Sequence, residues 1–184
     1  MLQKELGAKG YEPATIALGA NTDPYQPVER QYRLTRDILK VLNDCNHPVG
    51  IVTKSALVTR DIDILKAMAE KGLVKVALSI TTLDHKLSRQ MEPRASAPGK
   101  RLQALELLSA AGIPTVAMTA PIIPAINDME IEKLLGAAQS AGAREAGYVL
   151  LRLPHELKEL FREWLEREFP DRAKHVMNLV RDIR

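Results

Sequence analysis

Short apolar runs alternate with amphipathic helical stretches along the whole of this 184-residue chain. The runs are continuous rather than alternating with polar residues, which favours strands that are covered on both faces. Five strands are predicted, at Ala14–Gly19, Pro48–Thr53, Val74–Ile80, Thr115–Thr119 and Ala146–Leu151. Strands separated by helices in this way are typical of βα units around a parallel sheet.

The segments between these strands carry apolar residues at the three- and four-residue spacing of a helix face. Helices are expected at Val28–Asp44, Arg60–Lys71, Lys100–Ala111, Met129–Ala141 and His155–Glu168, with Arg172–Arg184 as a terminal addition. The strongest apolar face runs from Leu157 to Phe169, and it indicates core or interface rather than a ligand site.

Glycine follows three of these helices, at Gly72, Gly112 and Gly142. A left-handed glycine at this position ends a helix before the next strand, so these turns mark the back of the sheet. The strand-to-helix loops should then lie together at the carboxyl end of the strands, where parallel sheets bind ligands.

Composition limits the class of protein. The chain is 46% hydrophobic and 27% charged, without a linker, so one globular domain over residues 1–184 is expected. No apolar run reaches the roughly 18 residues of a membrane span and no signal peptide is visible, so a cytoplasmic protein is expected.

The single cysteine, Cys45, excludes a metal site built from several thiolates of this chain and is expected to be a small buried hydrophobe. The net charge of +3 and the 4% of aromatic residues allow a nucleic-acid partner but do not indicate one.

The strand-to-helix loops hold the candidate binding residues. Thr22 and Asp23 could bind an ammonium or hydroxyl group, or could belong to an Asx turn shaped by Pro24. Lys54 could bind a carboxylate or form a Schiff base, or be a solvated loop residue. The Ser79 hydroxyl suits a sugar, although a serine satisfied within the strand end fits equally well.

The loop at Thr81–Gly99 has 19 residues, longer than connections without a function usually are. Within it, Glu92 and Arg94 could form a charge-paired lid, and Arg94 could grip an anion of the substrate, or the two could make a weak surface ion pair. In the next loop Asn127 and Glu130 have the spacing of a helix capping box.

Seven segments, taken in order, resemble the spore-photoproduct-lyase-like group of radical SAM proteins. They are Thr22-Asp23-Pro24-Tyr25-Gln26-Pro27, Thr53-Lys54-Ser55, Arg60-Asp61-Ile62-Asp63, Ser79-Ile80-Thr81-Thr82-Leu83-Asp84, Glu92-Pro93-Arg94, Pro121-Ile122-Ile123-Pro124 and Leu151-Arg152-Leu153-Pro154. The resemblance implies an α/β fold, a partial (β/α)6 TIM-like barrel of radical SAM type with about five βα units in this chain. It also implies S-adenosylmethionine as cofactor and a four-iron four-sulfur cluster that reduces it to methionine and a 5′-deoxyadenosyl radical.

By position, the resemblance assigns Thr22 and Asp23 to the methionine amine of S-adenosylmethionine and Lys54 to its carboxylate. It assigns Ser79 to the ribose or to polar groups nearby. Ile122 and Leu151 would flank the adenine. The charges agree, because a lysine suits a carboxylate and an aspartate suits an ammonium group.

One part of the resemblance fails. The family holds its cluster with Cys-x-x-x-Cys-x-x-Cys after the first strand, and this sequence lacks those cysteines. Cys45 alone cannot hold a cluster that needs three thiolates. Residues Met1–Gly10 look like the tail of the helix that follows the motif, so an N-terminally truncated chain without its own radical chemistry is expected.

Three other interpretations stay open. The chain could be a Schiff-base lyase using Lys54, which borohydride trapping would detect. It could be a module that binds S-adenosyl compounds without a cluster. It could also be an inactive gene fragment with an open sheet edge at Ala14–Gly19, prone to self-association. The sequence does not identify a substrate.

Overall fold

A single five-stranded parallel sheet organises the molecule, and its strands follow one another in chain order. The computed structural model describes residues 1–154 and 156–182. The strands are β1 (Ile16–Leu18), β2 (Val49–Thr53), β3 (Val74–Ser79), β4 (Thr115–Ile122) and β5 (Glu145–Leu150). The predicted α/β fold with five βα units in a partial barrel is therefore confirmed.

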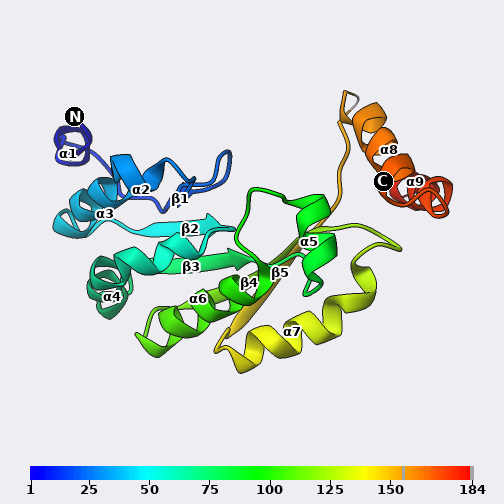
Figure 1. Cartoon of the computed structure of the whole chain (residues 1–184). Coiled ribbons are helices and arrows are strands. Elements are labelled where there is room, and N and C mark those ends of the chain that lie inside the picture. Colours follow the sequence, from blue (N-terminus) through cyan, green and yellow to red (C-terminus); the bar gives the residue numbers. More distant parts are fainter. Residues whose placement is uncertain (155, 183–184) are drawn as a thin grey trace.

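Helices connect the strands and line one face of the sheet (Figure 1). The α-helices are α1 (Leu2–Leu6), α2 (Glu29–Tyr32), α3 (Leu34–Asp44), α4 (Ile62–Glu70), α5 (His85–Met91), α6 (Pro98–Ala110), α7 (Ile131–Ser140), α8 (Leu157–Glu168) and α9 (Ala173–Asp182). Two 3-10 helices, η1 (Ala56–Asp61) and η2 (Asp128–Glu130), precede α4 and α7. In Figure 1, α5, α8 and α9 lie beyond the carboxyl ends of the strands.

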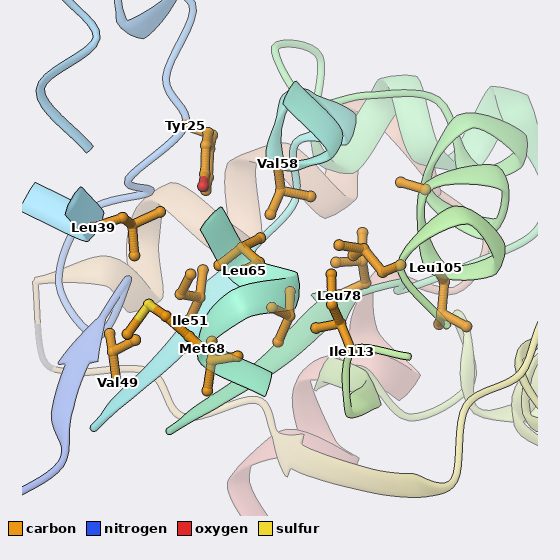
Figure 2. Close-up of a cluster of buried hydrophobic side chains, with 14 of the residues drawn as sticks. Tyr25, Leu39, Val49, Ile51, Val58, Leu65, Met68, Leu78, Leu105 and Ile113 are labelled. Carbon is orange, nitrogen blue, oxygen red and sulfur yellow. The ribbon is translucent and has the colours of Figure 1, made fainter. Parts of the chain in front are cut away.

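The main core lies between the sheet and helices α3, α4, α6 and α7. Alternate residues of β2 and β3 point to this face and are buried, and each helix contributes residues spaced by three or four positions. Figure 2 shows Val49 and Ile51 of β2 beside Leu65 and Met68 of α4. This packing fixes the sheet and hence the position of its strand ends.

A second, smaller core joins α5, the loop after β4, α8 and α9. Leu87, Ile123, Leu165 and Val176 are its buried centre, and Trp164 packs against it. The apolar face predicted between Leu157 and Phe169 is thus confirmed in part: Phe161, Trp164, Leu165 and Phe169 pack in this core, whereas Leu157 and Leu160 are 47% and 61% exposed. This core fastens the C-terminal helices over the carboxyl ends of β4 and β5.

One helix prediction and one loop prediction are wrong in detail. The helix expected at Val28–Asp44 is broken at Arg33, whose φ of 54° is left-handed, so that α2 ends and α3 begins there. The loop expected at Thr81–Gly99 contains α5. Asp84 caps this helix, because its carboxylate accepts hydrogen bonds from the backbone N–H groups of Lys86 and Leu87 at 2.6 and 3.0 Å. The predictions for His155 and for residues 183–184 lie outside the described residues.

The prediction that the strands are covered on both faces is wrong for β5 and for part of β2. Tyr148 pairs with the buried Thr119 and faces the helix side, yet it is 70% exposed; Val149 on the other face of β5 is 48% exposed, and Val52 of β2 is 37% exposed. The chain leaves β5 for α8, which packs at the strand ends rather than against β5. Cys45, at the end of α3, is also exposed rather than buried.

The three predicted glycine turns are confirmed, with φ values of 68°, 80° and 94° at Gly72, Gly112 and Gly142. These turns lie at the amino ends of the strands, so the strand-to-helix loops, in which ligand binding is predicted, are at the opposite edge. Within the described part of the chain, none of the helices has the length and apolar character needed to cross a membrane.

Two leucines of α6 provide a test of the main core. Leu105 is 0% exposed and Leu107 is 48% exposed. Leu105→Ala is expected to lower the free energy of unfolding by about 2–5 kcal/mol, because it leaves a cavity in a closely packed core. Leu107→Ala should change it by no more than about 0.5 kcal/mol. Urea unfolding followed by circular dichroism measures both, and equal effects would contradict the described core.

Candidate functional site

Lys54, the residue directly after β2, lies between two hollows at the carboxyl ends of the strands. We call them the Asp23 hollow and the Trp164 hollow after a residue that lines each. Parallel sheets present their ligand sites at this edge. Lys54 is therefore the centre of the candidate site.

The Asp23 hollow has a volume of about 610 Å³ and is lined by charged side chains together with apolar surface. Asp23, Lys54 and Arg94 all line it, so the fold brings together three residues that were singled out in separate loops. Thr22 is exposed beside Asp23, and Arg94 is exposed on the rim. Arg94 is thus accessible to an anionic group, as its assignment to substrate requires.

The Trp164 hollow has a volume of about 460 Å³ and joins charged and apolar residues. Lys54 and Glu92 supply the charges, whereas Leu151 and Trp164 belong to an apolar wall. Further lining residues are Gln90, Met91, Pro121, Ile123 and Phe161. A cavity of this size with few charged groups in an apolar wall suits an organic ligand with one charged end.

The Asp23 carboxylate is held by donors of the chain itself. Oδ1 accepts hydrogen bonds from the Tyr25 backbone N–H at 2.8 Å and from the Thr53 hydroxyl at 2.6 Å. Oδ2 accepts one from the Lys54 backbone N–H at 2.8 Å. The bond to Tyr25 is the Asx turn that the sequence left open. Asp23 thereby fixes the loop after β1 to the end of β2.

Glu92 connects Lys54 to the interior. Glu92 Oε1 lies 3.3 Å from Lys54 Nζ, and Oε2 accepts a hydrogen bond from Thr81 at 3.1 Å. Arg101 Nη2 lies 2.7 Å from Oε2, at an angle outside that of a hydrogen bond. The predicted Glu92–Arg94 pair is wrong: across the described residues, the ion pairs of Glu92 are those with Lys54 and Arg101.

Arg101 of α6 is 1% exposed and binds the backbone of two other segments. Its Nη1 donates to the Ser79 carbonyl at 2.9 Å and its Nε to the Ser96 carbonyl at 2.6 Å. One guanidinium thus fastens the end of β3, the long loop and Glu92 together.

The remaining assigned residues have different surroundings. Ser79 is buried, and its hydroxyl donates to the Ala120 carbonyl at 3.2 Å, so it is satisfied within the protein. Leu151 lines the Trp164 hollow with Lys54. Ile122 instead lines a third hollow beside Ile131 of α7. The structure therefore brings Leu151, but not Ile122, to the wall that faces Lys54.

The capping box expected at Asn127 and Glu130 is absent, because both side chains bind loops that are far away in the sequence. Asn127 is 1% exposed; its amide nitrogen donates to the Thr81 carbonyl at 2.9 Å, and its oxygen accepts from the Ile123 N–H at 2.7 Å. The Glu130 carboxylate accepts from the Thr82 hydroxyl at 2.9 Å. These bonds tie the loop after β4 to that after β3.

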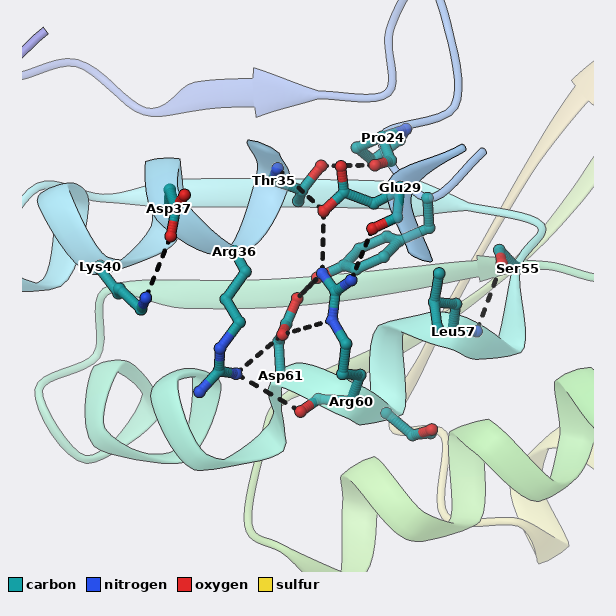
Figure 3. A network of polar contacts seen from close by, with 12 residues as sticks. Pro24, Glu29, Thr35, Arg36, Asp37, Lys40, Ser55, Leu57, Arg60 and Asp61 are labelled. Atoms are coloured by element: carbon teal, nitrogen blue, oxygen red, sulfur yellow. Dashed lines mark hydrogen bonds and ion pairs between the residues drawn. The ribbon is translucent and has the colours of Figure 1, made fainter. Parts of the chain in front are cut away.

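A buried charge network lies behind the Asp23 hollow (Figure 3). Asp61 is fully buried and accepts hydrogen bonds from Arg36, Arg60 and the Tyr25 hydroxyl, at distances of 2.8 to 3.1 Å. Arg60 also binds Glu29 at 2.9 Å. The network joins α2 and α3 to η1, and through Tyr25 it holds the loop that carries Asp23.

Ionisation within this network follows from the paired charges. Burial opposes the charge of Asp61, but hydrogen bonds from Arg60 and Arg36 outweigh it and lower the pKa of Asp61. A hydrogen bond from Arg36 lowers the pKa of the more exposed Asp63 to about 2. Burial, together with the neighbouring Asp61, raises the pKa of Tyr25, so this phenol stays protonated.

The described residues do not fit an iron–sulfur cluster. They contain one cysteine, Cys45, which is exposed at the end of α3 that precedes the amino end of β2, remote from Lys54. Across residues 1–154 and 156–182 there is also no group of three or more His, Cys, Asp or Glu side chains placed to hold a metal ion.

The fold is an α/β partial barrel with a candidate ligand site around Lys54 at the strand ends. The model of the radical SAM superfamily matches residues 2–138. The chain belongs to the radical SAM superfamily, which confirms the resemblance that its motifs carry. The family implies S-adenosylmethionine and a four-iron four-sulfur cluster.

Two curated relatives illustrate the likeness in sequence. An uncharacterized protein of Mycobacterium tuberculosis is 33% identical over 183 residues, covering 98% of this chain and 54% of the relative. An uncharacterized protein of Methanocaldococcus jannaschii is 31% identical over 163 residues, covering 89% of this chain and 60% of the relative. The chain thus spans little more than half the length of these relatives.

Solved structures share the fold. A mutant spore photoproduct lyase with bound AdoMet and dinucleoside spore photoproduct matches with a TM-score of 0.67 and 18% identity, over 92% of this chain and 49% of that chain. Streptococcus suis SuiB bound to S-adenosylmethionine matches with a TM-score of 0.57 and 14% identity, over 88% of this chain and 37% of that chain.

Several residues of the site were not assigned to it from the sequence. The sequence pattern pairs Glu92 with Arg94 and predicts only packing for the apolar face that includes Trp164. It gives no signal for Arg101. Trp164 does pack, since its indole N–H donates to the Gln90 carbonyl at 3.2 Å, but it also faces the hollow. Because Trp164 is far from Lys54 along the chain, no local sequence signal indicates that both residues line the same hollow.

Asp61→Asn tests the charge network. Removing the charge leaves two arginines without their buried partner and should lower the free energy of unfolding by about 3 kcal/mol at neutral pH. Because the folded-state pKa is lowered, this stabilisation is present above the unfolded-state value of 3.8 and is lost as the pH falls below it. The difference between wild type and variant should therefore shrink on acidification in urea titrations.

The control for this prediction is Asp37→Asn. Asp37 forms an exposed ion pair with Lys40 on α3 and should contribute no more than about 1 kcal/mol. A similar loss in both variants, or a difference that grows on acidification, would contradict the described network.

Proposed function

We propose that this chain binds S-adenosylmethionine at the carboxyl ends of its strands, with Lys54 on the carboxylate of the ligand. The observation that carries the proposal is the Trp164 hollow, which places one ammonium group at an apolar and aromatic wall. S-adenosylmethionine has a charged amino-acid end and a flat adenine, and this combination of surfaces matches both. The structural neighbours with bound AdoMet or S-adenosylmethionine support the proposal.

Leu151 and Trp164 would pack against the adenine. The assignments of Ile122 to the adenine and of Ser79 to the ribose stay predictions, because Ile122 lines a different hollow and the Ser79 hydroxyl donates to Ala120. Thr22 and Asp23 border the neighbouring hollow on the other side of Lys54. Arg94, exposed on its rim, is assigned to an anionic group of the substrate. These roles extend the assignments made from the resemblance.

Generation of a 5′-deoxyadenosyl radical would require a four-iron four-sulfur cluster held by cysteines that this sequence does not contain. We propose that radical chemistry belongs to a longer protein that supplies them. Reading the coding DNA in frame upstream of Met1 tests this: Cys-x-x-x-Cys-x-x-Cys after an apolar strand is expected, and an immediate in-frame stop would count against it.

The geometry favours ligand binding over Schiff-base chemistry at Lys54. A Schiff base begins with attack by a neutral amine, whereas Lys54 Nζ is in an ion pair with Glu92. Borohydride reduction with carbonyl compounds should accordingly leave Lys54 unmodified.

Binding can be measured through Trp164, the single tryptophan of the chain. Titration with S-adenosylmethionine should change the tryptophan emission in a saturable way, because the indole lines the hollow. Lys54→Met should weaken binding by about 10- to 100-fold, the effect of losing a hydrogen bond to a charged group. Calorimetric titration checks the same affinities.

Lys66→Met is the matched control, because Lys66 is exposed on α4. It should leave the affinity within about twofold of wild type, the range of a surface substitution. Equal binding by the Lys54→Met variant and the wild type would exclude Lys54 as the carboxylate contact.

A further inference from the structure

Two carboxylates near Lys54, those of Asp23 and Glu92, could bind the amino group of the ligand, and their surroundings differ. Both oxygens of Asp23 are engaged by three donors of the chain, which fix the loop after β1. These bonds occupy three of the roughly four lone-pair positions of a carboxylate. Asp23 therefore mainly shapes the site and has little acceptor capacity left for a ligand.

Glu92 is arranged differently. Only Oε2 is held from behind, by Thr81 and Arg101, and these contacts fix the orientation of the carboxylate. Oε1 is turned toward Lys54 Nζ, 3.3 Å away. The Glu92 side chain is 11% exposed and lines the Trp164 hollow, so Oε1 stands at a largely desolvated surface. Charge-assisted contacts are strong in such surroundings.

We propose that the Lys54–Glu92 ion pair is the recognition unit for the α-amino acid group of the ligand, with Glu92 on the ammonium and Lys54 on the carboxylate. An α-amino acid carries both charges on one carbon, so its two groups are as close together as the two ends of this ion pair. Insertion of the ligand places each charge against its opposite and leaves neither protein charge unpaired. This inference rests on the proposed binding of S-adenosylmethionine.

Arg101 gives the arrangement its rigidity. It is 1% exposed and bound to the ends of β3 and the long loop, so Glu92 is positioned from a fixed support. Glu92→Gln keeps an amide oxygen that can still accept from Thr81 and face Arg101, and it removes the negative charge. The variant is therefore expected to fold, which a thermal melt verifies.

Three thioethers that share the 5′-thioadenosine part and differ in the group on sulfur provide the test: S-adenosylhomocysteine, its decarboxylated form S-adenosyl-3-thiopropylamine, and 5′-methylthioadenosine, which has a methyl group in place of the charged chain. Calorimetric titration gives the affinity of each for the wild-type chain and for each variant. Glu92→Gln should weaken binding of the two amine-containing ligands by about tenfold or more and leave 5′-methylthioadenosine within about twofold. Lys54→Met should weaken only S-adenosylhomocysteine, which alone carries the carboxylate.

Two further variants complete the comparison. Glu106→Gln, at an exposed position of α6, should bind all three ligands like the wild type. Asp23→Asn should weaken all three alike, because it loosens the loop rather than a ligand contact. An amine-selective loss in Asp23→Asn instead of Glu92→Gln would overturn the inference, as would equal weakening of all three ligands by Glu92→Gln. Failure of the wild type to bind any ligand would overturn the proposed function itself.

Discussion

Burial of one face of the sheet under helices α3, α4, α6 and α7 is the constraint on which the other features depend. Parallel strands need a crossover between each pair, and here every crossover returns a helix to the same face. All strands consequently end at one edge, and loops that are far apart in the chain meet there. The opposite face is less covered: Val52 and Val149 are 37% and 48% exposed.

Long-range polar contacts turn these separate loops into one site. Asp23 joins the ends of β1 and β2, Arg101 and Glu92 join β3 to the long loop, and Asn127 joins the loops after β3 and β4. Each contact is made by a side chain that is buried or partly buried, where an unpaired polar group would be costly. The site is therefore held by the same bonds that close the loops.

The chain belongs to the radical SAM superfamily by its fold and sequence, but its described residues lack the cysteines on which the radical chemistry of the family depends. The barrel strands and the lysine-centred site belong to the described residues, whereas the cysteines that a cluster needs do not. The chain corresponds to little more than half the length of the relatives described above. We propose that its own residues bind and orient an S-adenosyl ligand, and the experiments described above test this function.

The sequence alone determined the parallel α/β fold, the glycine turns and the loops that carry Lys54 and Asp23, because apolar periodicity and turn residues act locally. It did not reveal the helix break at Arg33 or the exposure of both faces of β5, because both features depend on what packs against each segment. Only the tertiary structure decided that Glu92 pairs with Lys54 and Arg101 rather than with Arg94 two residues away. Ion-pair partners are set by distance in space, and that distance exists only once the strands have brought their loops together.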